Sequence, residues 1–323
     1  MLPRLRLKPP TIYYIHPLQP ATPALYPAVP ALSATRALSP TSAIRIACNS
    51  PPSRFYSSST SPNTVTSAVS ETPPPPPPPS RWVSDVRARI GKCIAFGCDP
   101  TQARQAASIM NILAKEWRVL SAGSEGFLSG GRRGLEGQQV VWGEMDSFGH
   151  VNNANYIRYA ESSRVNWILH FGAQDPKHRR EWAELMKPVS VGLIMKAITA
   201  EYKFPMTYPD TISAYHKLRS CPTSTDTSLI LDCVIISHRH RRVAARTAED
   251  VAIYDYREAR KTTLPSFVLD VLQSTWQRQE EQIKWARERI WGLLKEVESL
   301  ENETWNREGA IEDLGAAGNR KGT

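Results

Sequence analysis

Hydrophobic residues between positions 138 and 263 fall into short runs typical of strands and one longer stretch typical of a helix. The short runs are rich in Val, Ile, Thr and Tyr, whereas Asn152 to Phe171 has apolar residues at helical spacing. This order predicts one strand, one long helix and then four antiparallel strands, which is an α+β architecture. The predicted strands are residues 138–144, 189–204, 210–218, 228–237 and 243–256.

Helical patterns flank this segment on both sides. Residues 84–96 predict a short helix, and a second helix begins at Asp99-Pro100, where a capping carboxylate precedes a proline, and ends near Gly123. In residues 264–308, apolar residues recur every three or four positions, and only Gln279 interrupts them. This pattern predicts either a coiled coil or a long helix that folds back on its own domain.

The two ends of the chain have a different composition. The first 70 residues contain no acidic residue and carry six basic ones among many Ser, Thr, Ala and Pro. This composition is typical of a mitochondrial transit peptide, so we expect residues 1–56 to be removed in the matrix. Residues 57–83 predict a disordered Ser/Thr/Pro-rich linker that includes the seven prolines Pro73–Pro79, and residues 309–323 predict a disordered tail. The remaining divisions are an N-terminal helical segment at 84–137, the α+β domain at 138–263 and the long helix at 264–308.

Charge and cysteine content narrow the possible partners. The whole chain has a net charge of +9, but removal of the six presequence charges leaves 34 basic and 31 acidic residues, a net charge of +3. A net charge this small does not indicate a nucleic-acid partner. No apolar run is long enough to span a membrane, and the five cysteines lack the spacing of a zinc site, so we expect neither a membrane span nor a metal.

One stretch between the first predicted strand and the long helix carries candidate chemistry. Asp146 follows the strand, a Gly-His turn comes next, and Asn152 and Asn153 open the helix. A carboxylate beside the free amides of a helix start can attack a thioester, because the carboxylate supplies the base or nucleophile and the amides receive the oxyanion. The alternative interpretation is that Asp146 caps a turn or the helix.

This run, Asp-x-x-Gly-His-Val-Asn-Asn-x-x-Tyr, resembles the signature of hotdog-fold acyl-CoA thioesterases of the 4-hydroxybenzoyl-CoA thioesterase-like group. The resemblance covers residues 140–264, and the flanking helices resemble those of a fungal-type mitochondrial member. It implies a hotdog fold, in which an antiparallel sheet wraps a long helix, and at least a homodimer. It also implies an acyl-CoA substrate, with no cofactor beyond the coenzyme A of that substrate.

The resemblance also implies roles for individual residues. Asp146 would act on the thioester carbonyl as nucleophile or as base for water, and His150 would bond the thioester oxygen, orient a water or only hold the turn. The amides from Val151 to Asn153 are the oxyanion-hole candidates. Tyr156 is expected to line the acyl pocket or the core. The basic turn Arg239, Arg241 and Arg242 is a candidate for the phosphates of coenzyme A, and Glu161 and Arg164 predict an ion pair on one helix face.

Two other functions fit the same pattern. A hotdog fold can serve as a non-catalytic structural or assembly protein of a mitochondrial complex such as the ribosome, with the long helices binding the partner. A hotdog dehydratase fits less well, because its acidic residue is expected on the long helix whereas Asp146 precedes it. The Asp146 motif favours the acyl-CoA thioesterase, which releases a fatty or aromatic acid and coenzyme A.

The first prediction concerns import. Residues 54–57, Arg-Phe-Tyr-Ser, resemble a matrix processing site with the cut after Tyr56. N-terminal sequencing of the mature protein should therefore begin at or within a few residues of Ser57. A mature protein that still begins at Met1 would show that this segment is not a cleaved presequence.

Overall fold

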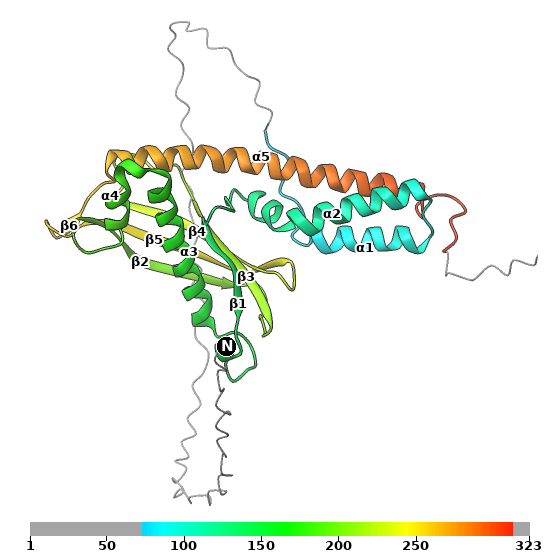
Figure 1. Ribbon diagram of the computed structural model, residues 1–323, viewed down its shortest axis with the longest axis horizontal. Helices are drawn as coiled ribbons and strands as arrows, with labels where there is room; N and C mark the ends of the chain where they lie inside the picture. Colours follow the sequence, from blue (N-terminus) through cyan, green and yellow to red (C-terminus); the bar gives the residue numbers. More distant parts are fainter. Residues whose placement is uncertain (1–72, 313–323) are drawn as a thin grey trace, which may run out of the picture. The chain divides into compact units, whose positions relative to one another are not determined.

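The computed structural model describes residues 73–312. Its centre is an antiparallel sheet in the order β1-β3-β4-β5-β2, with the short β6 paired to β5. Helix α3 (Asn153–Gln174) lies against this sheet, and the strands curve around it (Figure 1). The predicted order of strand, long helix and antiparallel strands, expected for a hotdog fold, is therefore present. The strands are β1 (Gly134–Val140), β2 (Val191–Tyr202), β3 (Asp210–Leu218), β4 (Ser228–Ser237), β5 (Arg242–Asp255) and β6 (Arg260–Lys261).

Helices α1 (Trp82–Ala95), α2 (Pro100–Gly123) and α5 (Ser266–Glu303) form the rest of the chain's regular structure, with the short α4 (Arg179–Glu184) beside α3. The predicted caps are confirmed. The Asp99 carboxylate accepts the amides of Thr101 and Gln102 at 2.7 and 3.0 Å, and the Asn152 side chain accepts the amide of Ala154 at 2.9 Å. None of the described helices combines the length and the apolar composition that a crossing of the bilayer requires.

Both predicted boundaries of the first strand are wrong by four residues. β1 begins four residues earlier than expected, because Gly137, at φ +68°, forms an irregularity that keeps the glycine-rich segment in register with β3. It ends at Val140 because the Glu144 carboxylate accepts the amide of Val141 and turns Trp142–Glu144 into a 3-10 helix. The predicted presequence and its cleavage site lie outside the described residues.

The last part of the predicted linker is structured. The carbonyl of Pro75 accepts a hydrogen bond from Arg287 at 3.0 Å, and that of Pro76 accepts one from Trp291 at 2.9 Å. Both donors lie on α5, so the proline segment is attached along this helix. An extended proline run exposes its carbonyls because it makes no hydrogen bonds of its own.

Both faces of the central strands β3 and β4 are buried. On β3, Ile212 and Ala214 face α3, whereas Tyr215 joins the core that α1, α2 and the second half of α5 share. On β4, Ile235 faces α3 and Val234 faces the opposite core. The sheet therefore lies between two helical layers, and few of its central side chains reach solvent.

The packing of helix α5 distinguishes between the coiled coil and the folded-back helix, the two alternatives predicted from its sequence. Its first turns pack on the sheet domain through Val268 and Leu272, and its later turns pack on α1 and α2 through buried residues such as Ile290 and Leu293. The helix thus folds back on its own chain, as one of the two alternatives predicted. Within residues 73–312, its apolar stripe is covered by this chain and not by a second helix of a coiled coil.

Gln279, the interruption in that stripe, has a structural role. Its side chain is 2% exposed and bonds the backbone of Leu218 twice, accepting its amide and donating to its carbonyl, both at 3.0 Å. β1 pairs with β3 only as far as Tyr215, so the outer edge of β3 at Leu218 lacks a strand. The amide of Gln279 replaces that strand and leaves no buried backbone group unpaired there.

Candidate active site

A tight turn between β1 and α3 carries Asp146. The amide of Asp146 donates to the carbonyl of His150 at 2.8 Å, and the amide of Gly149 donates back to the carbonyl of Asp146 at 3.0 Å. Gly149 has a φ of +73°, which a side chain disfavours. One carboxylate oxygen, Oδ1, accepts the amide of Phe148 at 2.9 Å, whereas Oδ2 makes no hydrogen bond with any of residues 73–312. Asp146 therefore caps its turn with one oxygen, and its other oxygen has no hydrogen-bond partner among the described residues.

Glu144 holds this turn against the start of α3. Its backbone carbonyl accepts the amide of Asn152 and the side-chain amide of Asn155, both at 2.9 Å. Its carboxylate accepts the amide of Val141 at 2.9 Å and the hydroxyl of Tyr159 at 2.7 Å. Burial, and then the bond to Glu144, raise the pKa of Tyr159, so its hydroxyl stays a donor. The sequence interpretation missed Glu144, whose position three residues after Val141 is the spacing of a capping box.

The backbone amides at the helix start are not equally free. The amide of Val151 donates to the carbonyl of Met206 at 2.8 Å, and that of Asn152 donates to the carbonyl of Glu144 at 2.9 Å. Two of the three predicted oxyanion donors are therefore occupied, and the prediction is wrong for them. The amide of Asn153, the first residue of α3, has no acceptor among residues 73–312. It is the donor that remains for a ligand.

A pocket of about 460 Å³ opens beside this turn. Five of the predicted site residues line it together: Asp146, His150, Val151, Asn153 and Tyr156. The end of β2 and the segment after it also line the pocket, through Tyr202, Lys203, Phe204 and Pro205, as does Phe148. Asn152 is absent from this lining, because its side chain caps α3.

Tyr156 lines the pocket and belongs to the core. It is 2% exposed, its hydroxyl accepts the amide of Met206 at 3.2 Å, and its ring meets that of Tyr202 edge-on with centroids 5.2 Å apart. Burial raises the pKa of the Tyr156 phenol, so it is neutral at physiological pH. Its role is to shape an apolar surface beside Asp146.

The predicted arginine cluster divides between two places, neither of them in this pocket. The backbone amide of Arg239 donates to the Asp210 carboxylate at 3.0 Å, and its side chain donates to the carbonyl of Pro209 at 3.4 Å. Arg241 and Arg242 line a separate pocket that also includes Lys203 and Phe204. The structure therefore separates Arg239 from Arg241 and Arg242, which the sequence interpretation had grouped.

A second polar cluster lies buried between α3 and the sheet, and sequence reasoning missed it. His216 Nδ1 is 3.0 Å from the Ser163 hydroxyl, and its Nε2 is 3.2 Å from the Glu249 carboxylate. Glu249 also accepts from Arg164 at 2.7 Å and from the Thr247 hydroxyl at 3.1 Å. Serine, histidine and glutamate in this order resemble a hydrolytic triad.

This buried cluster is structural. Ser163 and Glu249 are 0% exposed and His216 is 1% exposed, so no substrate reaches the hydroxyl. The cluster gives buried polar groups their partners and joins α3 to β3 and β5. A sequence signal existed: position 216 has the same strand parity as Ile212 and Ala214, which places a histidine on the face that α3 covers.

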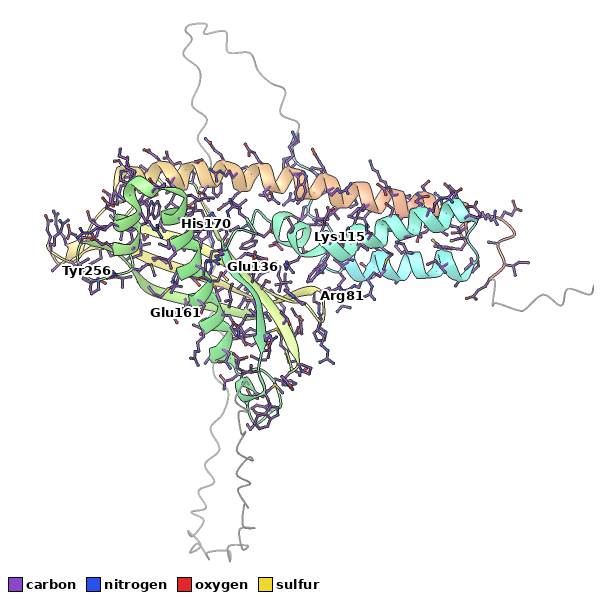
Figure 2. All side chains as sticks on the ribbon, viewed as in Figure 1. Arg81, Lys115, Glu136, Glu161, His170 and Tyr256 are labelled. Atoms are coloured by element: carbon purple, nitrogen blue, oxygen red, sulfur yellow. The ribbon has the colours of Figure 1, made fainter. Side chains whose placement is uncertain are left out.

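The predicted ion pair of Glu161 with Arg164 is wrong. Arg164 pairs with Glu249 at 2.7 Å, and Glu161 forms no ion pair with residues 73–312. Glu161 is exposed on α3 (Figure 2). A buried carboxylate without a counter-charge is destabilising, so the guanidinium of Arg164 pairs with Glu249. The three-residue spacing on the helix could not show this partner across the sheet.

One part of the chain matches a known protein family. Residues 140–272 match the family model of the Thioesterase-like superfamily. A comparison with curated proteins found no match. The matched residues include the whole turn, the pocket and the start of α5, and exclude α1, α2 and most of α5.

Several solved structures are similar to this segment. The PA2801 protein of Pseudomonas aeruginosa is 24% identical over 42% of this chain and 94% of its own, with a TM-score of 0.34. A thioesterase of Thermus thermophilus, complexed with coenzyme A and Zn, is 18% identical over 47% and 96%, with a TM-score of 0.34. The DHNA-CoA thioesterase of Staphylococcus aureus is 13% identical over 49% and 90%, with a TM-score of 0.32.

The second prediction concerns acid stability. Burial opposes the charge of Glu249, but His216 and Arg164 outweigh it and hold the pKa of Glu249 at about 2, below its ordinary value of 4.5. A carboxyl group whose pKa is lower in the folded than in the unfolded state stabilises the fold at pH values above its unfolded pKa. This stabilisation is lost as the pH falls from about 4.5 to about 2. Denaturant unfolding should show Glu249→Gln less stable than wild type by about 3–5 kcal/mol at neutral pH.

The difference between the two proteins should shrink as the pH falls through this window. Glu161→Gln removes an exposed carboxylate from α3 and serves as the matched control, whose stability should follow that of the wild type. Parallel stability curves for wild type and Glu249→Gln across the acid range would contradict the proposed ionisation of Glu249.

Proposed function

We propose that the protein is an acyl-CoA thioesterase that hydrolyses a fatty or aromatic acyl-CoA in mitochondria, with Asp146 as its reactive carboxylate. The observation that carries the proposal is that Asp146 and Asn153 line the same pocket, and that one oxygen of Asp146 and the amide of Asn153 make no hydrogen bond with any of residues 73–312. Attack on a thioester requires two groups, a base or nucleophile and a donor that stabilises the oxyanion. The thioesterase-like match of residues 140–272 supports the same reaction.

The chemistry follows from these two groups. Asp146 removes a proton from water, whose oxygen attacks the thioester carbon, or attacks that carbon itself and is released by water afterwards. The carbonyl electrons move onto oxygen, where the amide of Asn153 stabilises the negative charge. When the carbonyl re-forms, the carbon–sulfur bond breaks. In the first route the leaving sulfur of coenzyme A takes the proton that Asp146 had removed from water. In the second route coenzyme A leaves as the thiolate, and it takes a proton from the water that later hydrolyses the anhydride of the acyl group with Asp146. The products are the free acid and coenzyme A.

The third prediction tests the carboxylate. Asp146→Asn keeps the cap on the amide of Phe148 but removes the base or nucleophile, so kcat should fall about 10²- to 10⁴-fold at unchanged thermal stability. Asp85→Asn, at an exposed position of α1, is the control and should retain activity. Full activity in Asp146→Asn would mean that Asp146 only caps its turn.

The fourth prediction tests the oxyanion donor. Proline fits the first position of a helix, and the extended backbone of Asn152, with ψ 138°, suits a residue that precedes proline. Asn153→Pro should therefore keep α3 but remove the free amide and lower kcat about 10²- to 10³-fold. Asn153→Ala retains the amide and should stay close to wild type. An equal loss in both variants would assign the effect to the side chain and reject the amide as donor.

Exposed apolar residues around the pocket support a homodimer. Trp142 and Phe148 are 75% and 83% exposed, and Tyr208 is 48% exposed. All three lie on the two segments that meet at the site, and a concentration of exposed aromatic residues is typical of a protein contact. A second copy of the chain is the partner we propose for this surface.

The fifth prediction tests this assembly. Sedimentation equilibrium should give the mass of a dimer for the wild type and a smaller mass for Trp142→Asp, because a charge would be placed in the contact. Trp285→Asp replaces a half-exposed tryptophan on α5 and should leave the mass of the dimer unchanged. A wild type that is monomeric at all concentrations would reject the dimer.

A further inference from the structure

The proposed reaction leaves one nucleophilic side chain unused on the face of the sheet opposite α3. This side chain is Lys217, on β3, and it is the one lysine of residues 73–312 that is not exposed. It lines a pocket of about 640 Å³ and a second pocket of about 240 Å³. A small molecule in either pocket can therefore meet an amine that is partly withdrawn from water.

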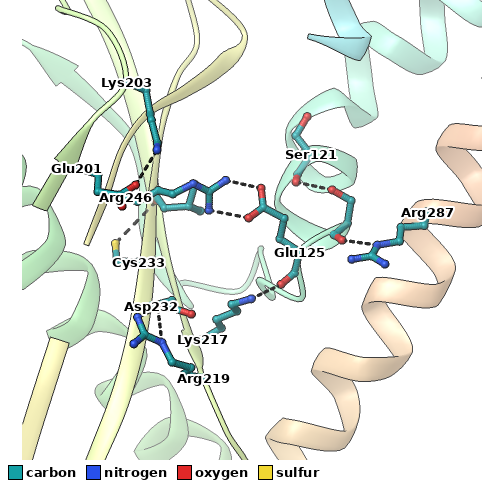
Figure 3. A network of polar contacts seen from close by, with 12 residues as sticks. Ser121, Glu125, Glu201, Lys203, Lys217, Arg219, Asp232, Cys233, Arg246 and Arg287 are labelled. Atoms are coloured by element: carbon teal, nitrogen blue, oxygen red, sulfur yellow. Dashed lines mark hydrogen bonds and ion pairs between the residues drawn. The ribbon is translucent and has the colours of Figure 1, made fainter. Parts of the chain in front are cut away.

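The ammonium of Lys217 forms no ion pair with a carboxylate of residues 73–312. Its nitrogen donates to the backbone carbonyl of Glu125 at 2.5 Å (Figure 3), and it lies 5.0 Å from the centroid of the Phe127 ring. The Glu125 carboxylate accepts instead from both outer nitrogens of Arg246, at 2.6 Å each. The charge of the lysine is therefore compensated only by a carbonyl dipole and an aromatic ring.

Charged groups surround Lys217 on every element packed around it. They are Glu125 just after α2, Glu201 on β2, Lys203 just after β2, Arg219 on β3, Asp232 on β4, Arg246 on β5, and Glu280 and Arg287 on α5. Most of them already have partners: Asp232 pairs with Arg219, Glu201 pairs with Lys203, and Arg287 donates to the carbonyl of Ser124 (Figure 3). The carboxylates near the lysine are thus largely neutralised by arginines and by Lys203.

This environment favours the unprotonated amine. Burial lowers the pKa of the Lys217 ammonium below its ordinary value of 10.5. Arg246 lowers this pKa further, whereas the neighbouring carboxylates raise it. A lysine whose pKa is lowered by desolvation acts as a nucleophile towards carbonyl carbon. The bond to the Glu125 carbonyl occupies an N–H of the amine and leaves the nitrogen lone pair for attack.

We propose that Lys217 is a site of covalent acylation by small acyl thioesters. The unprotonated amine attacks the thioester carbon, and the carbonyl electrons move onto oxygen, whose negative charge the basic side chains of the larger pocket favour. When the carbonyl re-forms, the carbon–sulfur bond breaks, and the leaving sulfur takes the proton that the nitrogen releases. The products are an amide-linked acyl-lysine and a free thiol.

This site is distinct from the candidate active site. Asp146 lines a different pocket, so acyl transfer to Lys217 does not depend on hydrolysis there. The pocket of about 240 Å³ has room for a short acyl chain, and Phe127 and Ala248 give its wall apolar surface. Acylation removes the charge of Lys217 but keeps one N–H for the Glu125 carbonyl, so the modified side chain retains its hydrogen bond.

The test treats the protein with S-acetyl-N-acetylcysteamine at mildly alkaline pH and follows the acetylation of each lysine by peptide mass spectrometry. Lys217 should be acetylated several-fold faster than Lys115, which is exposed on α2 (Figure 2). Exposure alone would give the opposite order. Lys203 is the matched control, because it lines the same larger pocket but is exposed and paired with Glu201 at 2.6 Å. It should react no faster than Lys115.

Two further measurements separate the folded environment from the intrinsic reactivity of a lysine. Acetylation of Lys217 should accelerate at a lower pH than that of Lys115, because its amine loses the proton more readily. In urea the two lysines should react at equal rates, because unfolding removes the environment that distinguishes them.

Arg246→Gln removes a neighbouring cation and releases the Glu125 carboxylate, so it should slow the acetylation of Lys217 and leave that of Lys115 unchanged. Asp146→Asn should be acetylated like the wild type, so labelling of a protein that hydrolyses no acyl-CoA would uphold the site and reject only the thioesterase. Acetylation of Lys217 no faster than that of Lys115, or a difference that persists in urea, would overturn the proposal. Equal rates at Lys217 and Lys203 would also overturn it, by assigning the reaction to reagent gathered in the pocket.

Discussion

The burial of both faces of the two central strands, β3 and β4, is the constraint on which the rest of this structure depends. A sheet with one solvated face would need only α3, but β3 and β4 carry apolar residues on both faces, so a second helical layer must cover the other. α1, α2 and the later turns of α5 form that layer. The chain outside the thioesterase-like segment is thus part of the same core and not an independent appendage.

Because both faces of the central strands are buried, their polar side chains must find partners within the protein. His216 on one face reaches Glu249, and Lys217, the next residue, reaches the carbonyl of Glu125 on the other face. Gln279 completes the exposed edge of β3 in the same way. Such groups are costly when unpaired in an apolar environment, so their partners fix the helices relative to the strands. The candidate active site lies at the rim of this rigid body, where the chain leaves the sheet and begins α3.

Local signals in the sequence predicted the elements that depend on local physics. The bounds of β3 and β4, the cap of α2 at Asp99 and the cap of α3 at Asn152 follow from residue patterns within a few positions. The grouping of Asp146, His150 and Asn153 in one pocket was also predicted from one short motif.

The features that the sequence did not reveal depend on contacts between distant residues. Arg164 has Glu161 three positions away, yet it pairs with Glu249 across the sheet. The amide of Val151 is withdrawn from the oxyanion site by the carbonyl of Met206, 55 positions later in the chain. The fold-back of α5 was left as one of two alternatives, because the same apolar spacing serves a coiled coil.

The central claim is that the thioester of an acyl-CoA binds between Asp146 and the start of α3. The most direct measurement is a crystal structure of the Asp146→Asn variant with an acyl-CoA bound. The thioester carbon should face residue 146, and the carbonyl oxygen should lie within hydrogen-bond distance of the amide of Asn153. A thioester bound away from this turn, or a carbonyl oxygen with no contact to that amide, would contradict the account.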